Sequence, residues 1–153
     1  MTQEEFQELL EEGTAAEDMF VGWLESKNWN CRKTLPQDKT EPFDYFIMHK
    51  ERGHMRTIEI KSYGAPHYRT IFAETLQVKS NTVPEYLLYT DHIDYMIYVD
   101  QQNRKAFMYK MDEFASYVRA NQHKEFTINR GTAKGIKIPE CCEAAGYIRT
   151  IDL

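Results

Sequence analysis

Apolar residues near the start of the chain recur with a helical period. The apolar positions of residues 15–27 are Ala16, Met19, Phe20, Trp23 and Leu24. This spacing places them on one side of a helix. Thr14, with Glu17 three residues later, is typical of a capping box at a helix start. We therefore predict a first helix over residues 3–12, a break at Gly13, and a second helix over residues 15–27.

Aromatic and β-branched residues dominate several later stretches, which favours strands. Residues 43–50 and 55–62 flank a turn-like link at residues 51–54, so they are expected to form a hairpin. Tyr95–Asp100 is expected to be a buried strand, with Ala106–Met111 as its hairpin partner. The pattern thus predicts two hairpins separated by a connecting region.

The connecting and terminal regions carry weaker patterns. Residues 70–78 favour a strand, with a helix as the alternative. Asp112 is expected to cap the helix that follows the second hairpin. The other expected segments are a loop over 34–42, a helical or irregular crossover over 83–94, a helix over 112–122 and a strand over 135–138. The fold class is then α+β (α/β), with a mixed central sheet flanked by helices.

Composition and charge narrow the class of protein. The chain has 153 residues, of which 42% are apolar, and this suits one domain over residues 1–153. Its three cysteines lack CxxC spacing, which favours a reducing, intracellular setting over a disulfide framework. The acidic start is unlike a signal peptide, and no stretch is apolar enough to span a membrane, so we expect a cytoplasmic protein. The net charge of −5 counts against tight binding of long duplex DNA by phosphate contacts alone.

The first hairpin gathers three charged residues on one face. Glu59 and Lys61 are two positions apart on a strand, so their side chains share a face. Directly paired residues of a hairpin have a constant sum of numbers, and the turn favours an odd sum such as 103 or 105. The first places Asp44 opposite Glu59, and the second places it opposite Lys61. An even sum, or a bulge, would separate them.

Two adjacent carboxylates and a lysine suit phosphodiester chemistry. Ionised carboxylates at close range repel each other, and a divalent cation removes that conflict. Carboxylate oxygens are the ligands that Mg²⁺ and Mn²⁺ prefer. A lysine beside them would orient an attacking water or stabilise charge on the phosphate. The alternative is that Glu59 and Lys61 form an exposed stripe, with Ile58 and Ile60 on the buried face.

Pro42-Phe43-Asp44, fourteen residues, and then Glu59-Ile60-Lys61 resemble the signature of the PD-(D/E)XK nucleases. The sequence departs from that signature at Phe43, which separates the proline from the aspartate. The resemblance covers about residues 14–115. It implies a four-stranded mixed sheet between helices and a Mg²⁺ (or Mn²⁺) ion held by Asp44, Glu59 and the carbonyl of Ile60. It also implies an acidic residue from the preceding helix, matched here by Glu17, for which the capping box is the competing explanation.

The resemblance implies an endonuclease that hydrolyses DNA, with phage, restriction or junction-resolving roles. The same centre would cleave RNA, so both nucleic acids stay open as substrates. A homodimer is one arrangement, because two copies would make two cuts. The alternative function is an inactive nuclease-like module that binds nucleic acid or a protein partner. Roles for Glu74 and Gln77 also stay open, since the structure of their segment is ambiguous.

Overall fold

The computed structural model describes residues 2–34, 44–128 and 131–153, without the side chains of Phe6 and Leu9. The helices are α1 (Gln3–Ser26), α2 (Glu85–Leu88) and α3 (Met111–Ala120), and the 3-10 turns are η1 (Pro66–Tyr68), η2 (Thr90–His92), η3 (Gln122–Lys124) and η5 (Glu143–Ala145). The strands are β1 (Trp29–Lys33), β2 (Tyr45–His49), β3 (Met55–Ser62), β4 (Thr70–Gln77), β5 (Tyr95–Asp100), β6 (Lys105–Lys110), β7 (Phe126–Ile128), β8 (Ala133–Pro139) and β9 (Tyr147–Asp152). The loop expected over 34–42 lies outside the described residues, apart from Thr34.

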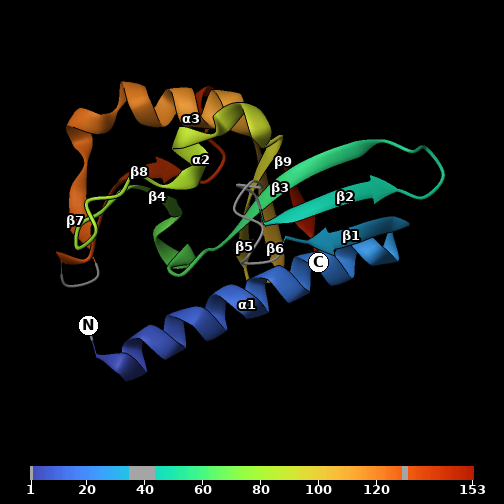
Figure 1. Ribbon diagram of the computed structural model, residues 1–153, viewed down its shortest axis with the longest axis horizontal. Helices are drawn as coiled ribbons and strands as arrows, with labels where there is room; N and C mark the ends of the chain where they lie inside the picture. Colours follow the sequence, from blue (N-terminus) through green and yellow to red (C-terminus); the bar gives the residue numbers. More distant parts are fainter. Residues whose placement is uncertain (1, 35–43, 129–130) are drawn as a thin grey trace.

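The strands form two sheets. The main sheet is six-stranded, in the order β1-β2-β3-β5-β6-β9, and the second is three-stranded, in the order β4-β8-β7. Strands β3 and β5 pair in parallel, whereas the other pairs within both sheets are antiparallel. Figure 1 shows α1 along one side of the main sheet and α2, α3 and the second sheet on the other. The predicted mixed sheet flanked by helices is therefore confirmed.

Helix α1 is continuous, which corrects the prediction of two helices. Its N-cap is Thr2, which forms a reciprocal capping box with Glu5. The Thr14 hydroxyl instead donates a hydrogen bond to the carbonyl of Leu10, 3.0 Å away, so Thr14 caps nothing. Gly13 lies inside the helix, where it costs about 1 kcal/mol relative to alanine without ending it. None of the helices formed by the described residues is both long and apolar enough to cross a lipid bilayer.

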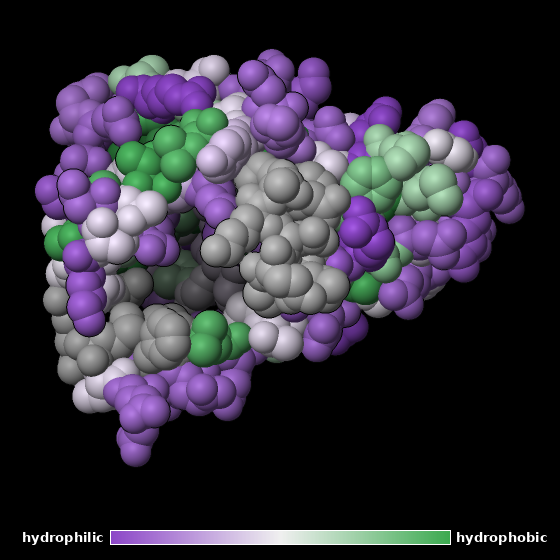
Figure 2. Space-filling model, viewed as in Figure 1, coloured by the Kyte–Doolittle hydropathy of each residue, from purple (hydrophilic) through white to green (hydrophobic). Residues whose placement is uncertain are grey.

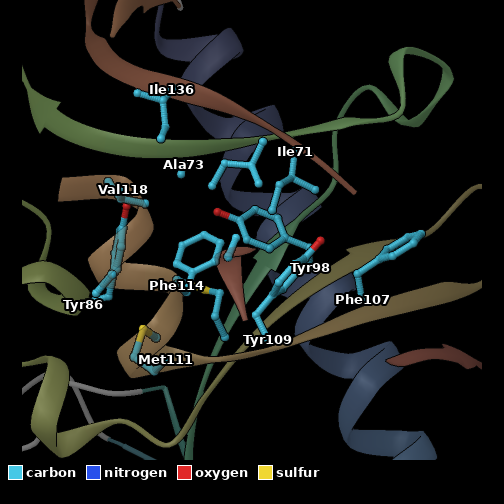
Figure 3. Packing of buried hydrophobic residues seen from close by; sticks show 14 of the residues in the cluster. Ile71, Ala73, Tyr86, Tyr98, Phe107, Tyr109, Met111, Phe114, Val118 and Ile136 are labelled. Carbon is cyan, nitrogen blue, oxygen red and sulfur yellow. The ribbon is translucent and has the colours of Figure 1, made fainter. Parts of the chain in front are cut away.

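The two faces of the main sheet bury separate groups of side chains. Ala16, Phe20 and Leu24 of α1 pack against β2, β3 and β5, with Ile97 and Val99 in the same cluster. Such i, i+4, i+8 spacing aligns buried side chains along one stripe of a helix. The larger cluster lies on the opposite face and joins the main sheet to α2, α3 and the second sheet (Figure 3). Its labelled members are Ile71, Ala73, Tyr86, Tyr98, Phe107, Tyr109, Met111, Phe114, Val118 and Ile136.

Most later predictions are confirmed, with shifts at the ends. Residues 70–77 form a strand, and residues 85–88 and 90–92 supply the short helical crossover. Helix α3 begins at Met111 with Lys110 as its N-cap, so the expected cap at Asp112 is wrong. Strand β8 is longer than the predicted 135–138. Strands β1, β7 and β9 were not predicted, since they are short or carry mixed exposure along their length.

Candidate active site

The hairpin of β2 and β3 adopts the odd register that brings the three charged residues together. Tyr45 pairs with Ile58 and Met48 with Met55, which is the register whose sum is 103. Asp44 lies just before β2, and its N–H donates to the carbonyl of Ile58 at 3.1 Å. The odd register predicted from the turn is therefore confirmed, and it places Asp44 opposite Glu59 on the same face of the hairpin. Pro42 and Phe43 of the motif lie outside the described residues.

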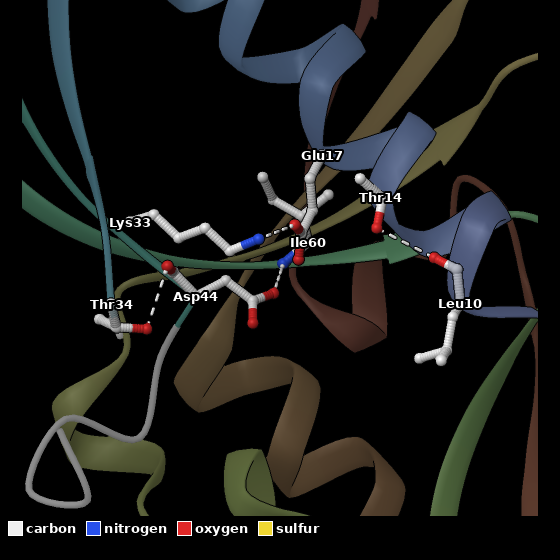
Figure 4. Close-up of polar contacts among 7 residues, drawn as sticks. All are labelled: Leu10, Thr14, Glu17, Lys33, Thr34, Asp44 and Ile60. Atoms are coloured by element: carbon white, nitrogen blue, oxygen red, sulfur yellow. Dashed lines mark hydrogen bonds and ion pairs between the residues drawn. The ribbon is translucent and has the colours of Figure 1, made fainter. Parts of the chain in front are cut away.

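The Asp44 carboxylate is fixed against the backbone of β3. Its Oδ2 accepts a hydrogen bond from the N–H of Ile60 at 2.8 Å (Figure 4). The backbone carbonyl of Asp44 accepts a second hydrogen bond, from the N–H of Thr34 at 3.0 Å. Hydrogen bonds to a charged acceptor are stronger than neutral ones, so Asp44 has a defined orientation. The Asp44 side chain is thereby held at the peptide bond between Glu59 and Ile60.

Glu59 is a buried carboxylate that is paired with Lys61. The residue is 8% exposed, and the Lys61 ammonium lies 3.3 Å from its Oε1. Burial, with a smaller contribution from the Asp44 charge, raises the pKa of Glu59 to about 8, although the Lys61 charge opposes this. Burial lowers the pKa of Lys61, but the charges of Glu59 and Asp44 outweigh that, so the pKa is raised and Lys61 stays protonated. The alternative of an exposed, solvated stripe does not fit Glu59.

Glu17 reaches the same region from α1 but is already paired. The Lys33 ammonium of β1 lies 3.0 Å from its Oε2 (Figure 4). Burial raises the pKa of Glu17, a hydrogen bond from Lys33 lowers it, and the Asp44 charge raises it, which shows that the two carboxylates are neighbours. With Thr14 no longer a cap, the capping explanation for Glu17 is removed. Sequence reasoning gave Lys33 no role at this site, because the strand that carries it was not predicted.

A cavity of about 340 Å³ opens beside Glu59 and Lys61. Glu74 and Gln77 of β4 lie on its wall, so their strand conformation still brings them to the site. Burial raises the pKa of Glu74, and the Lys61 charge and a hydrogen bond from Gln77 oppose the rise. The rest of the wall comes from residues 82–86. Figure 2 shows the drawn face hollowed on the side of the second sheet.

The buried Glu59 makes stability depend on pH. Its folded pKa of about 8 exceeds the ordinary value of 4.5, so the folded state holds a proton that the unfolded state releases. Stability without divalent cations is therefore expected to fall as pH rises from about 5 to about 8. Thermal unfolding in EDTA across that range measures the slope. Glu59→Gln should flatten it, while Glu8→Gln on the exposed part of α1 should not; an unchanged slope in Glu59→Gln contradicts the assignment.

Comparisons with known proteins identify the fold. Neither a protein-family model nor a curated protein sequence matches the chain. Among solved structures, the chain is similar to the bacterial homing endonuclease I-Ssp6803I, with a TM-score of 0.54 and 15% sequence identity. The similarity covers 69% of this chain and 71% of that chain. The chain thus has a fold similar to that of a nuclease.

Proposed function

We propose that this chain is a divalent-metal-dependent nuclease of the PD-(D/E)XK type that hydrolyses phosphodiester bonds of DNA. The observation that carries the proposal is the meeting of the Asp44 carboxylate, the Glu59 carboxylate and the Lys61 ammonium on one face of the hairpin, with Glu59 and Lys61 lining a cavity. A mixed sheet and one helix hold this group in place. The similar fold of a homing endonuclease supports the same class of chemistry.

The residues present fit a hard divalent cation. Within the described residues, no group of three or more His, Cys, Asp or Glu side chains is arranged to hold a metal. Mg²⁺, however, commonly binds through one or two carboxylates, with water and substrate oxygens completing its shell. Asp44 and Glu59 supply two such carboxylates. Burial is the largest cause that raises the pKa of Glu59, and the charge of Asp44 raises it further, against the opposing charge of Lys61. A cation would relieve that repulsion.

The proposed roles follow from the positions of the side chains. Asp44 and Glu59 would hold the cation with the carbonyl of Ile60, and the cation would offset charge on the phosphate and acidify water. Lys61 is a protonated donor 3.3 Å from Glu59, placed to stabilise negative charge that develops on the phosphate. Glu17 would support the site as a further carboxylate, at the cost of loosening its ion pair with Lys33.

A cleavage assay tests the proposal. The purified protein is incubated with supercoiled plasmid, linear duplex, single strands, a four-way junction and RNA, in Mg²⁺, Mn²⁺ or EDTA. Cleavage is expected only with a divalent cation, and Asp44→Asn should abolish it. Asp18→Asn, on the exposed side of α1, is the matched control and should cleave normally. Cleavage that persists in EDTA or in Asp44→Asn would contradict the metal-dependent mechanism.

Metal binding is measured separately from cleavage. Mn²⁺ is expected to raise the melting temperature of the wild type, because a ligand that binds only the folded state stabilises it. Asp44→Asn should show a much smaller rise, and Asp18→Asn the same rise as the wild type. If Mn²⁺ gives no rise and no substrate is cut, the chain is instead an inactive nuclease-like module.

A further inference from the structure

The cavity beside Lys61 has three walls. Glu59 and Lys61 of β3 form one side, and Glu74 and Gln77 of β4 face them from the other strand. A third wall comes from residues 82–86, which include the apolar side chains of Val83 and Pro84. The cavity lining is therefore mainly polar, with a smaller apolar part at Val83 and Pro84.

An irregularity in β4 places Gln77 on the cavity side. Residues three apart on a regular strand point to opposite faces, so Glu74 and Gln77 would be separated. The pairing with β8 shifts between Glu74 and Leu76, which pair with the consecutive residues Gly135 and Lys134. One extra residue in β4, Thr75, absorbs the shift and turns Gln77 to the side of Glu74. The bulge thereby aims two polar side chains into one cavity.

The cavity wall is held in place by buried tyrosines. The hydroxyl of Tyr86 donates to the carbonyl of Glu74, and the hydroxyl of Tyr98 donates to the carbonyl of Phe72 at 2.9 Å. Gln77 forms paired backbone hydrogen bonds with Thr82, at 2.9 and 3.1 Å. The Oε1 of Gln77 accepts from Ser80, 3.5 Å away, which leaves its amide N–H groups for Glu74. The Glu74 carboxylate is thus oriented before any ligand arrives.

Charge and size restrict what the cavity accepts. Among the described residues, the carboxyl groups of Glu59, Glu74 and Glu85 and the ammonium of Lys61 line it. The carboxyl oxygens of Glu74 and Glu85, which lie outside the proposed metal centre, favour a group with N–H donors. The volume of about 340 Å³ is near the lower end of the roughly 300–1,000 Å³ typical of ligand pockets. A single flat heterocycle fits within this volume.

We propose that this cavity is a subsite for one unpaired nucleobase next to the scissile phosphate, read by Glu74 through an exocyclic amine. The inference rests on the proposed nuclease function and specifies its substrate: nucleic acid with an unpaired nucleotide at the cut. Carboxylates accept hydrogen bonds from the amino groups of cytosine and adenine, which thymine lacks. Moving a base out of its stack requires the least free energy when that base is already unpaired.

Fluorescence of 2-aminopurine tests the subsite. Asp44→Asn, which leaves the cavity lining intact, is bound to single-stranded and gapped DNA with 2-aminopurine at successive positions. Fluorescence is expected to rise at one position, because the base leaves its stacked neighbours. With the wild type, the cleaved bond should adjoin that position. A rise at no position, or an equal rise at all positions, overturns the subsite even if the wild type cleaves these substrates.

Filling the cavity supplies the matched control. Val83→Trp places a large ring in the cavity, whereas Leu88→Trp makes a similar change on α2 at a residue that is 58% exposed and outside the cavity. The fluorescence rise should disappear with Val83→Trp and persist with Leu88→Trp, with melting temperatures confirming that both fold. A rise that survives Val83→Trp would overturn the placement. If none of these proteins binds any nucleic acid, the nuclease function itself fails, and the subsite with it.

Base preference tests the role of Glu74. The wild type should cleave substrates with cytosine or adenine at the unpaired position about tenfold faster than those with thymine. Glu74→Met, which removes both acceptor oxygens, should reduce that ratio to near one by slowing the favoured substrates. An equal loss with all bases, together with a smaller thermal shift by Mn²⁺, would make Glu74 a metal ligand and overturn its role as a reader.

Discussion

Replacing Lys61 by methionine is expected to lower the rate of metal-dependent cleavage by about a hundred- to a thousand-fold. This is the usual cost of removing a single donor aimed at charge that develops during the reaction. Methionine keeps much of the chain length but removes the ammonium beside Glu59. Single-turnover cleavage of the best substrate measures the loss of rate. The affinity for the same substrate, measured in EDTA, should change far less.

The control for this result is Lys50→Met. Lys50 lies in the turn that joins β2 to β3, is exposed, and is at the far end of the hairpin from Asp44. Its removal should leave the cleavage rate unchanged. The Lys61 charge also lowers the pKa of Glu59, so the residual activity of Lys61→Met should need a higher pH. Equal losses in both variants would point to general electrostatic attraction of DNA instead.

Phe114→Ala is expected to destabilise the protein by about 3–5 kcal/mol, the range for truncating a large buried aromatic side chain. Phe114 is 0% exposed. Its ring centroid lies 5.9 Å from that of Tyr86, 6.0 Å from that of Tyr98 and 5.4 Å from that of Tyr109. The substitution therefore leaves a void where α3, the main sheet and α2 meet.

Urea unfolding measures the effect, with Leu88→Ala, at an exposed position of α2, as the control. The control should change stability by less than about 0.5 kcal/mol, as surface substitutions usually do. Tyr86 and Tyr98 also hold β4 through their hydroxyls, so Phe114→Ala should weaken binding at the cavity as well. A loss of stability well below the range expected for Phe114→Ala would mean that the neighbouring side chains repack to fill the void.

The local sequence pattern was sufficient to predict the β2–β3 hairpin, but it did not predict the continuous helix α1 or the edge strand β1. Alternation with period two and a short turn restricted the β2–β3 register to a few values, and one of these occurs. The break predicted at Gly13 failed because burial of Ala16 and Phe20 against the sheet outweighs a local propensity of about 1 kcal/mol. Strand β1 escaped prediction because it is an edge strand, with three of its five residues exposed.

Only those residues of the candidate site that belong to the β2–β3 hairpin could be predicted from the sequence. Asp44, Glu59 and Lys61 follow from the face alternation of two adjacent strands. The ion pair of Glu17 with Lys33 depends on how α1 packs over β1, a contact between elements that carry no common pattern. The cavity wall at β4 depends on an extra residue in one strand, and a bulge leaves no mark in the sequence.

The hydrogen bond from Ile60 to Asp44 gives the site its own spectroscopic reporter. Because the Ile60 N–H donates to a carboxylate rather than to a strand partner, its resonance frequency should follow the charge on Asp44. Titration with a diamagnetic cation such as Mg²⁺ should shift this one amide early, before the bulk of the sheet amides respond. Its rate of hydrogen exchange would likewise report local opening of the Asp44 contact, separately from global unfolding. A single backbone nucleus can thus register occupancy and motion at the centre without any substrate present.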